Sequence, residues 1–135
     1  MREFELNNLD KVKTHPNLVV KHFSNEMPAL LQNADLAISR AGAGAICELM
    51  VTKTHSILIP FQASADQHQD LNAAYMARFG GAVIVKQHNS KDNILRNILF
   101  NLLSSNSLMK MKSNMNSHDY LNPVHNIVEL LQAIS

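Results

Sequence analysis

The residues with the clearest chemical potential lie between Ser39 and Met50, in the run S-R-A-G-A-G-A-I-C-E-L-M. This run contains Gly42 and Gly44, two of the four glycines in the chain. The apolar residues 36–38 before it predict a buried strand, and the apolar pattern after it predicts a helix to about Thr52. A strand, a glycine-rich turn and a helix would present unpaired N–H groups and the positive end of a helix dipole to a phosphate.

Glu48 falls about one turn into this predicted helix, four residues after Gly44. A carboxylate there is poorly placed to bind phosphate, but it can accept hydrogen bonds from the hydroxyl groups of a ribose. The alternative is an ordinary turn in which Glu48 is a solvated helix residue, because two glycines without a third form a weak nucleotide-binding fingerprint. The glycine spacing alone favours this alternative.

A second polar stretch follows the predicted strand at 56–59. It begins as P-F-Q at Pro60 and continues as D-Q-H-Q-D-L-N-A from Asp66. Together with the run A-D-L-A-I-S-R-A-G-A-G-A-I-C-E-L, and in the same order, these motifs resemble the C-terminal domain of the bacterial undecaprenyldiphospho-muramoylpentapeptide β-N-acetylglucosaminyltransferase family. That family completes the lipid-linked peptidoglycan precursor. The resemblance extends from about Val19 to Val85.

The resemblance implies that the domain binds the donor UDP-N-acetylglucosamine, with no metal ion and no cofactor. The backbone at Ser24 would meet the uracil, the helix end would line the diphosphate, Glu48 would hold the ribose, and residues after Asp66 would contact the sugar hydroxyls. The implied donor-binding residues are Ser24, Gly42, Ala43, Gly44, Ala45, Ile46, Cys47, Glu48, His68, Gln69 and Asn72. Of these, His68, Gln69 and Asn72 are the sugar-contacting set.

Two positions depart from the family pattern. Ala41 stands where the family usually has a serine, and Ala45 stands where it often has a hydroxyl residue. Each missing hydroxyl donor would cost about 1 kcal/mol of phosphate binding. We therefore expect this chain to depend more on backbone donors.

Other interpretations of the polar residues remain open. Asp66, His68 and Asp70 could form a metal site, although alternate residues of a helix point to different faces. Cys47 lies among apolar residues and is expected to be a small buried hydrophobe rather than a nucleophile. Arg40 could contact phosphate, but we expect it to brace the turn, as a cation at a strand end usually does.

The alternation of strands and helices predicts an α/β fold with a parallel sheet. Strands are expected near 18–23, 36–39, 56–59 and 82–85, and helices near 2–14, 24–33, 43–52, 67–79, from Ser90, and from Asn122. The methionines of the polar segment 104–118 suggest loose core or a docking surface. With the resemblance, the chain would be a partial Rossmann-like C-terminal domain of a GT-B glycosyltransferase, with its motif core at 19–85 and C-terminal helices at 90–135.

Parts of the family pattern have no counterpart in the chain. These are the acceptor-binding half with its presumed general base, and two strands that would lie between the first and second predicted here. The 18–23 strand is therefore expected to be displaced, abnormally paired with 36–39, or an exposed edge.

We expect no catalytic residue in the chain and no transferase activity without an acceptor-binding domain or subunit. Three explanations remain. They are a truncated transferase, a free-standing donor-binding subunit like that of the eukaryotic N-glycan enzyme, and a catalytically silent nucleotide-binding module. The missing strands favour the first.

Composition limits the other classes of function. Apolar residues make up 46% of the 135-residue chain and charged residues 17%, which is typical of one soluble globular domain. The formal net charge of +1 gives no reason to expect a nucleic-acid partner. The single cysteine excludes an internal disulfide, and no signal peptide or membrane span is recognisable. We expect a cytoplasmic protein, peripheral at the inner face of the cytoplasmic membrane, whose membrane contact comes only through its partner.

Overall fold

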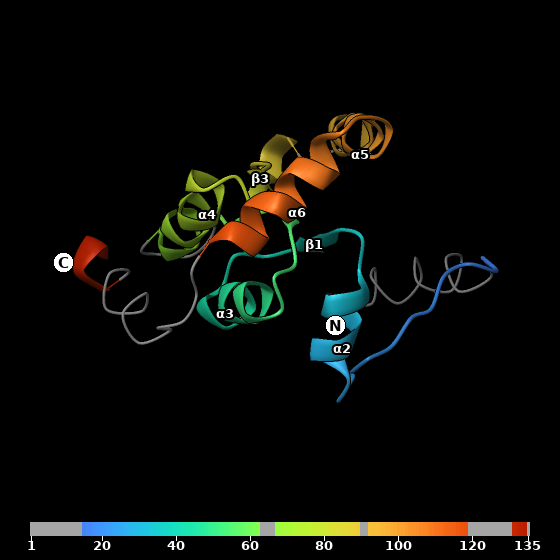
Figure 1. The fold of residues 1–135 in the computed structure, drawn as a ribbon, viewed down its shortest axis with the longest axis horizontal. Coiled ribbons are helices and arrows are strands. Elements are labelled where there is room, and N and C mark those ends of the chain that lie inside the picture. Colours follow the sequence, from blue (N-terminus) through green and yellow to red (C-terminus); the bar gives the residue numbers. More distant parts are fainter. Residues whose placement is uncertain (1–14, 63–66, 90–91, 119–130, 135) are drawn as a thin grey trace.

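The computed structural model describes residues 15–62, 67–89, 92–118 and 131–134. The elements follow one another as α2 (Met27–Asn33), β1 (Ala37–Ser39), α3 (Ala43–Val51), β2 (Ser56–Leu58), α4 (His68–Arg78), β3 (Ala82–Ile84), the 3-10 turn η1 (Gln87–Asn89), α5 (Asp92–Ser104) and α6 (Ser107–Ser117). Strands β1 and β2 are each followed directly by an α-helix, and β3 is followed by η1 and then by α5 (Figure 1). The α/β class predicted from the sequence is confirmed.

The three strands form one parallel sheet in the order β1-β2-β3. The central residues Ile38, Ile57 and Val83 lie in register across it. Every residue of the middle strand β2 is buried, as expected for a parallel strand covered on both faces. Strands were predicted at these three places, and the structure confirms them with slightly shorter bounds.

Two hydrophobic clusters cover the two faces of the sheet, because successive residues of a strand point to opposite sides. One cluster joins Leu58 to α3, α4 and α6 through residues such as Leu49, Met76 and Met115. The other joins Ile57 to α5 and α6. Its further buried members are Val85, Leu102 and Met111, and partly buried residues of α5 pack against it.

Helix α6 was not predicted, and it connects both clusters. Its sequence, S-L-M-K-M-K-S-N-M-N-S, is largely polar, but Met111 and Met115 are buried one turn apart. Met111 belongs to the α5 cluster and Met115 to the α3–α4 cluster. Met109 is 74% exposed. Two of the three methionines are therefore core residues, and the segment is a helix rather than an irregular connection.

The junction between α4 and α6 depends on a left-handed glycine. Gly80 has a φ of 79°, a conformation that side chains other than glycine rarely adopt. The Asn114 side chain donates a hydrogen bond to the Gly80 carbonyl at 3.1 Å. The His118 ring stacks on Phe79 with a centroid distance of 4.0 Å. These contacts fix the end of α6 against the end of α4.

The strand predicted at 18–23 is wrong. These residues form no strand, and Val19 and Phe23 are 78% and 80% exposed. The described part of the sheet ends at β1, so no neighbouring strand is available to pair the backbone groups of this segment, and an isolated strand is not stable in water. Helix α2 follows as predicted, with Pro28 in its first turn. It begins later than the predicted 24–33 range, because its N-cap is Glu26.

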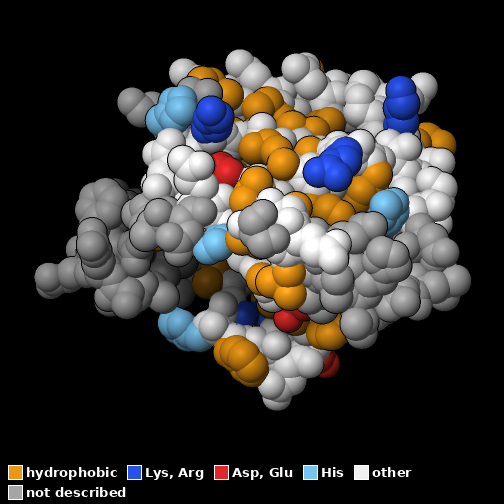
Figure 2. Space-filling view, turned by 90° about the vertical axis from the view of Figure 1, so that its left-hand side faces the viewer, with side chains coloured by type: hydrophobic (Ala, Val, Ile, Leu, Met, Phe, Trp, Pro, Cys, Tyr) orange, Lys and Arg blue, Asp and Glu red, His pale blue; other side chains and the backbone are white. Residues whose placement is uncertain are grey.

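Three further predictions lie outside the described residues: the helix at 2–14, the cap at Ser90, and the start of the last helix at Asn122. Within the described ranges, no helix has the length and apolar content needed to span a bilayer. Figure 2 shows one face of the molecule, on which the described Lys and Arg side chains stand apart among hydrophobic and polar ones.

Candidate functional site

The glycine-rich turn after β1 leads directly into an open helix end. Gly42 is the N-cap of α3, with an extended backbone (φ −63°, ψ 154°), and no described side chain caps the helix. The first intrahelical hydrogen bond runs from the Ile46 N–H to the Gly42 carbonyl, at 3.0 Å. The N–H groups of Ala43, Gly44 and Ala45 therefore precede the first internally bonded donor, at the positive end of the helix dipole.

The two glycines of this turn leave space in front of the backbone. A Cβ atom added at Gly44 would meet no heavy atom within 4 Å, and one at Gly42 would meet only Gln69 Nε2, at 4.0 Å. Neither glycine has the positive φ that would require a glycine. Folding therefore does not demand glycine at 44, whereas the close approach of a ligand to the backbone would.

Two side chains near the start of α4 form hydrogen bonds with the backbone of Ala41, the residue before Gly42. Ala41 is completely buried; its N–H donates to Gln69 Oε1 at 3.3 Å, and its carbonyl accepts from Asn72 Nδ2 at 2.9 Å. Gln69 Oε1 also accepts from the Phe61 N–H at 2.8 Å. Residues three apart lie on one face of a helix, which explains how Gln69 and Asn72 reach the same residue. Sequence reasoning proposed both residues as sugar contacts and missed this arrangement.

Arg40 braces the carboxyl ends of the strands, as predicted. Its Nη1 donates to the Ile59 carbonyl and to Gln87 Oε1, each at 3.2 Å. Its guanidinium lies 5.4 Å from the centre of the Phe61 ring, within the range of a cation–π contact. One side chain thus connects the segments that follow β1, β2 and β3.

The remaining predicted site residues have different degrees of exposure. Glu48 and His68 are exposed, the first on α3 and the second at the start of α4. Ile46 is 1% exposed and belongs to the core, so it offers a ligand only its backbone. Ser24 is half-buried, and its Oγ accepts a hydrogen bond from the Glu26 N–H at 3.1 Å.

The prediction that Cys47 is buried is wrong, because its thiol side chain is exposed. The buried face of α3 is formed by Ile46, Leu49 and Met50. At about 100° per residue, Cys47 falls on the opposite side of the helix from Leu49.

The metal-site alternative receives no support from the described ranges, where no three His, Cys, Asp or Glu side chains cluster. Asp66 lies outside these ranges, and the question of a metal ion stays a prediction.

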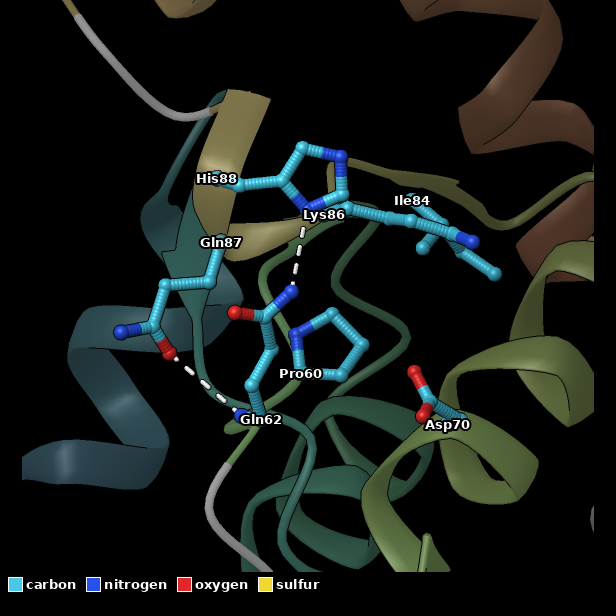
Figure 3. A pocket seen from close by; sticks show the side chains of 7 residues that line it. All are labelled: Pro60, Gln62, Asp70, Ile84, Lys86, Gln87 and His88. Atoms are coloured by element: carbon cyan, nitrogen blue, oxygen red, sulfur yellow. Dashed lines mark hydrogen bonds between the residues drawn. The ribbon is translucent and has the colours of Figure 1, made fainter.

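A pocket of about 360 Å³ lies at the carboxyl ends of β2 and β3, where Asp70 of the first turn of α4 also lines it (Figure 3). It is lined by Pro60, Gln62, Asp70, Ile84, Lys86, Gln87 and His88. Gln62 Nε2 and His88 Nδ1 are 3.0 Å apart, and the Gln62 N–H donates to Gln87 Oε1 at 3.4 Å. Gln87 and His88 were not among the predicted site residues. Their place just after a strand was the available signal, because the carboxyl ends of parallel strands meet at one edge of the sheet.

An open helix end beside a glycine-rich turn, at the carboxyl edge of a parallel sheet, defines an α/β domain suited to nucleotides. The chain belongs to glycosyltransferase family 28: its residues 2–131 match the family's C-terminal domain. The family resemblance predicted from the sequence motifs is confirmed.

The chain is 70% identical over 128 residues to the UDP-N-acetylglucosamine–N-acetylmuramyl-(pentapeptide) pyrophosphoryl-undecaprenol N-acetylglucosamine transferases of Prochlorococcus marinus strains NATL1A and NATL2A. These matches cover 95% of this chain and 36% of each relative, so the chain spans about a third of their length. The crystal structure of Acinetobacter baumannii MurG is similar with a TM-score of 0.74 and 25% identity, over 98% of this chain and 41% of that one. The predicted fold, part of the C-terminal domain of a GT-B glycosyltransferase, is confirmed.

Proposed function

We propose that the chain is the donor-binding part of an inverting, metal-independent N-acetylglucosaminyltransferase. Its donor would be UDP-N-acetylglucosamine, and the acceptor of the complete enzyme would be a lipid-linked muramoyl-pentapeptide of peptidoglycan synthesis. The observation that carries this proposal is the open N-terminus of α3, with free space in front of Gly44, in a chain so similar to transferases of that name.

The donor would lie along the carboxyl edge of the sheet. The diphosphate would accept hydrogen bonds from the N–H groups of Ala43 to Ala45, with further backbone contacts from Gly42, Ile46 and Cys47. Glu48 lies about 6 Å further along the helix axis than Gly44, at 1.5 Å per residue. That offset suits a ribose attached to a diphosphate at the helix end, and the exposed carboxylate is accessible to its hydroxyl groups.

The two ends of the donor would meet other segments. The uracil would meet the backbone at Ser24, which precedes α2. The sugar would face the first turn of α4, where His68 is exposed and Gln69 Nε2 is directed to the open side of Gly42. Asn72 is the third residue assigned to the sugar from the sequence.

The contribution of this chain to transfer would be stabilisation of the departing diphosphate. As the bond between the sugar and the phosphate breaks, negative charge accumulates on the leaving group, and the fixed N–H donors and dipole of α3 would stabilise it. The acceptor hydroxyl must also lose a proton, and we assign no residue of this chain as that base. The base and the acceptor site would come from a complementary N-terminal domain or subunit.

The same reasoning sets the expected partners and location. We propose that the chain acts in the cytoplasm, that it binds no nucleic acid, and that contact with the inner face of the membrane comes through the acceptor-binding partner.

Titration of the purified chain with UDP, ADP and GDP tests the proposal. We expect UDP to bind more tightly than ADP or GDP, and binding to persist in the presence of EDTA. Glu48→Ala should weaken UDP binding by about 1–3 kcal/mol, through the lost hydrogen bonds to the ribose. Glu48→Gln, which keeps one acceptor oxygen, should lose less.

Two results, one from calorimetry and one from a transfer assay, would contradict parts of the proposal. Unchanged UDP affinity in Glu48→Ala would show that the ribose lies elsewhere. Transfer by this chain alone, abolished by His68→Ala, would contradict the need for an acceptor-binding half and would make His68 the base.

A further inference from the structure

Both backbone polar groups of one buried residue, Ala41, are occupied by side chains of α4. The Ala41 N–H donates to Gln69 Oε1 and the Ala41 carbonyl accepts from Asn72 Nδ2, at 3.3 and 2.9 Å. Asn72 is only 7% exposed. Its amide N–H donor is therefore used inside the protein, at a position where little of the side chain remains accessible to a sugar.

Gln69 connects Ala41 to the loop that follows β2. Its Oε1 accepts from the Phe61 N–H at 2.8 Å as well as from Ala41, so one oxygen holds the segments that follow β1 and β2. Its Nε2 lies on the other side, 4.0 Å from the position of a Cβ at Gly42. The oxygen of Gln69 thus faces the backbone, and its nitrogen faces the open side of the turn.

Ala41 controls the direction of the helix donors. It precedes Gly42, the N-cap whose carbonyl accepts the first hydrogen bond of α3. A turn with glycines at 42 and 44 has many accessible backbone conformations, and fixing it costs conformational entropy. Holding Ala41 at both its N–H and its carbonyl fixes the peptide groups on either side of it, and this removes much of the freedom before any ligand binds.

We propose that Asn72 and the side-chain oxygen of Gln69 are positioning residues of the phosphate-binding turn, and that the sugar contacts of this turn of α4 belong to His68 and to Gln69 Nε2. This inference rests on the proposed donor site. It departs from the assignment made from the sequence, in which Asn72 contacts a sugar hydroxyl directly.

Titration with two ligands distinguishes the two roles of Asn72. A residue that contacts the sugar affects UDP-N-acetylglucosamine but not UDP, whereas one that positions the turn affects both equally. We expect Asn72→Ala to lower both affinities by the same factor, on the order of tenfold, the equivalent of one well-formed hydrogen bond. Arg78→Ala, at an exposed residue in the last turn of α4, alters the same helix without touching Ala41 and is the matched control. Loss of affinity for UDP-N-acetylglucosamine alone would overturn the proposal.

A second measurement does not depend on any ligand. Amide hydrogen exchange of the ligand-free chain should become faster at Ala41 and Ile46 in Asn72→Ala, relative to the rest of the protein. Met115→Ala, which destabilises the core through α6, should raise exchange without this local excess. Unchanged local exchange in Asn72→Ala would refute the positioning role even if the wild type failed to bind UDP, a failure that would count against the donor site alone.

A further variant tests the proposal if Asn72→Ala does not fold. If Asn72→Ala shows no cooperative thermal transition, Gln69→Met probes the same residue, Ala41, from its N–H side, with a side chain of similar length. We expect it to lower the affinity for UDP itself and to speed exchange at Ala41. Wild-type UDP affinity in a folded Gln69→Met variant would contradict the proposal.

Discussion

Replacing Gly44 by alanine separates the demands of folding from those of the ligand. Gly44 is the second residue of α3 and has a φ that alanine adopts readily, and a Cβ there would meet no heavy atom within 4 Å. Alanine exceeds glycine in helix propensity by up to about 1 kcal/mol in a helix interior. We expect Gly44→Ala to leave the free energy of unfolding unchanged or to raise it by about 0.5 kcal/mol.

The same methyl group should obstruct the ligand. A phosphate oxygen held by the N–H groups of the first turn lies about 2.9 Å from each nitrogen, and a methyl at Gly44 would occupy part of that space. Loss of one hydrogen bond to a charged acceptor costs about 1.5–3 kcal/mol. UDP affinity should therefore fall roughly 10- to 100-fold, while stability does not fall.

Calorimetric titration with UDP and thermal unfolding of the same samples test this pair of effects. Val51→Ala is the control, because Val51 is 71% exposed in the last turn of α3, far from the glycines along the helix. It should alter stability slightly and UDP affinity not at all. Wild-type UDP affinity in Gly44→Ala would refute the reasoning, because the space in front of Gly44 could then not be the place of the diphosphate.

Two further predictions concern stability. Gly80→Ala should destabilise the protein by about 1–3 kcal/mol in urea unfolding, because φ is 79° and the new Cβ would collide with the Asn114 side chain; an unchanged midpoint would contradict the described junction of α4 and α6. Burial lowers the pKa of His55 below 6.5, assisted by the Lys112 charge and opposed by a backbone hydrogen bond with Asp35 and by the Asp35 carboxylate. The unfolded chain therefore protonates His55 more readily than the folded protein does. The stability that comes from keeping this buried side chain neutral is complete above pH 6.5 and is lost as the pH falls below it. Between pH 7.5 and pH 5.5, the melting temperature should fall less for His55→Asn than for the wild type. An equal fall in both proteins would refute this role of His55.

Local sequence patterns predicted the elements whose partners are close in the chain. The strands β1, β2 and β3 and the helices between them follow from apolar runs broken by glycine and proline. The segment 18–23, L-V-V-K-H-F, has the composition of a strand, but its described residues are exposed and unpaired in any sheet. Strand formation requires a neighbour, and the composition of one segment carries no information about whether that neighbour exists.

The errors at α6 and Cys47 have a different origin. The polar composition of α6 hid its helical pattern, although Met111 and Met115 are spaced by one turn and Leu108 lies three residues before Met111. Cys47 has apolar neighbours in the sequence, but these form the buried face of α3, and Cys47 lies outside that face. Helical periodicity applied to Ile46, Leu49 and Met50 places Cys47 on the outer side, so this error was avoidable from the sequence.

The sequence predicted where the candidate site lies, but it did not predict which of its side chains hold the backbone. Gln and Asn side chains can hold a ligand or a backbone equally well, and the choice between these roles depends on which peptide lies within reach. In this protein the peptide groups within reach are the two on either side of Ala41. Its buried N–H and carbonyl are fixed by Gln69 and Asn72. At the proposed diphosphate site, Ala41 and Ala45 offer no hydroxyl donors, so the ligand would depend on backbone N–H groups, and these bind an anion well only when their direction is set in advance. The two side chains that hold Ala41 would therefore contribute most to the proposed binding, because a rigid turn matters most where the backbone is the principal donor.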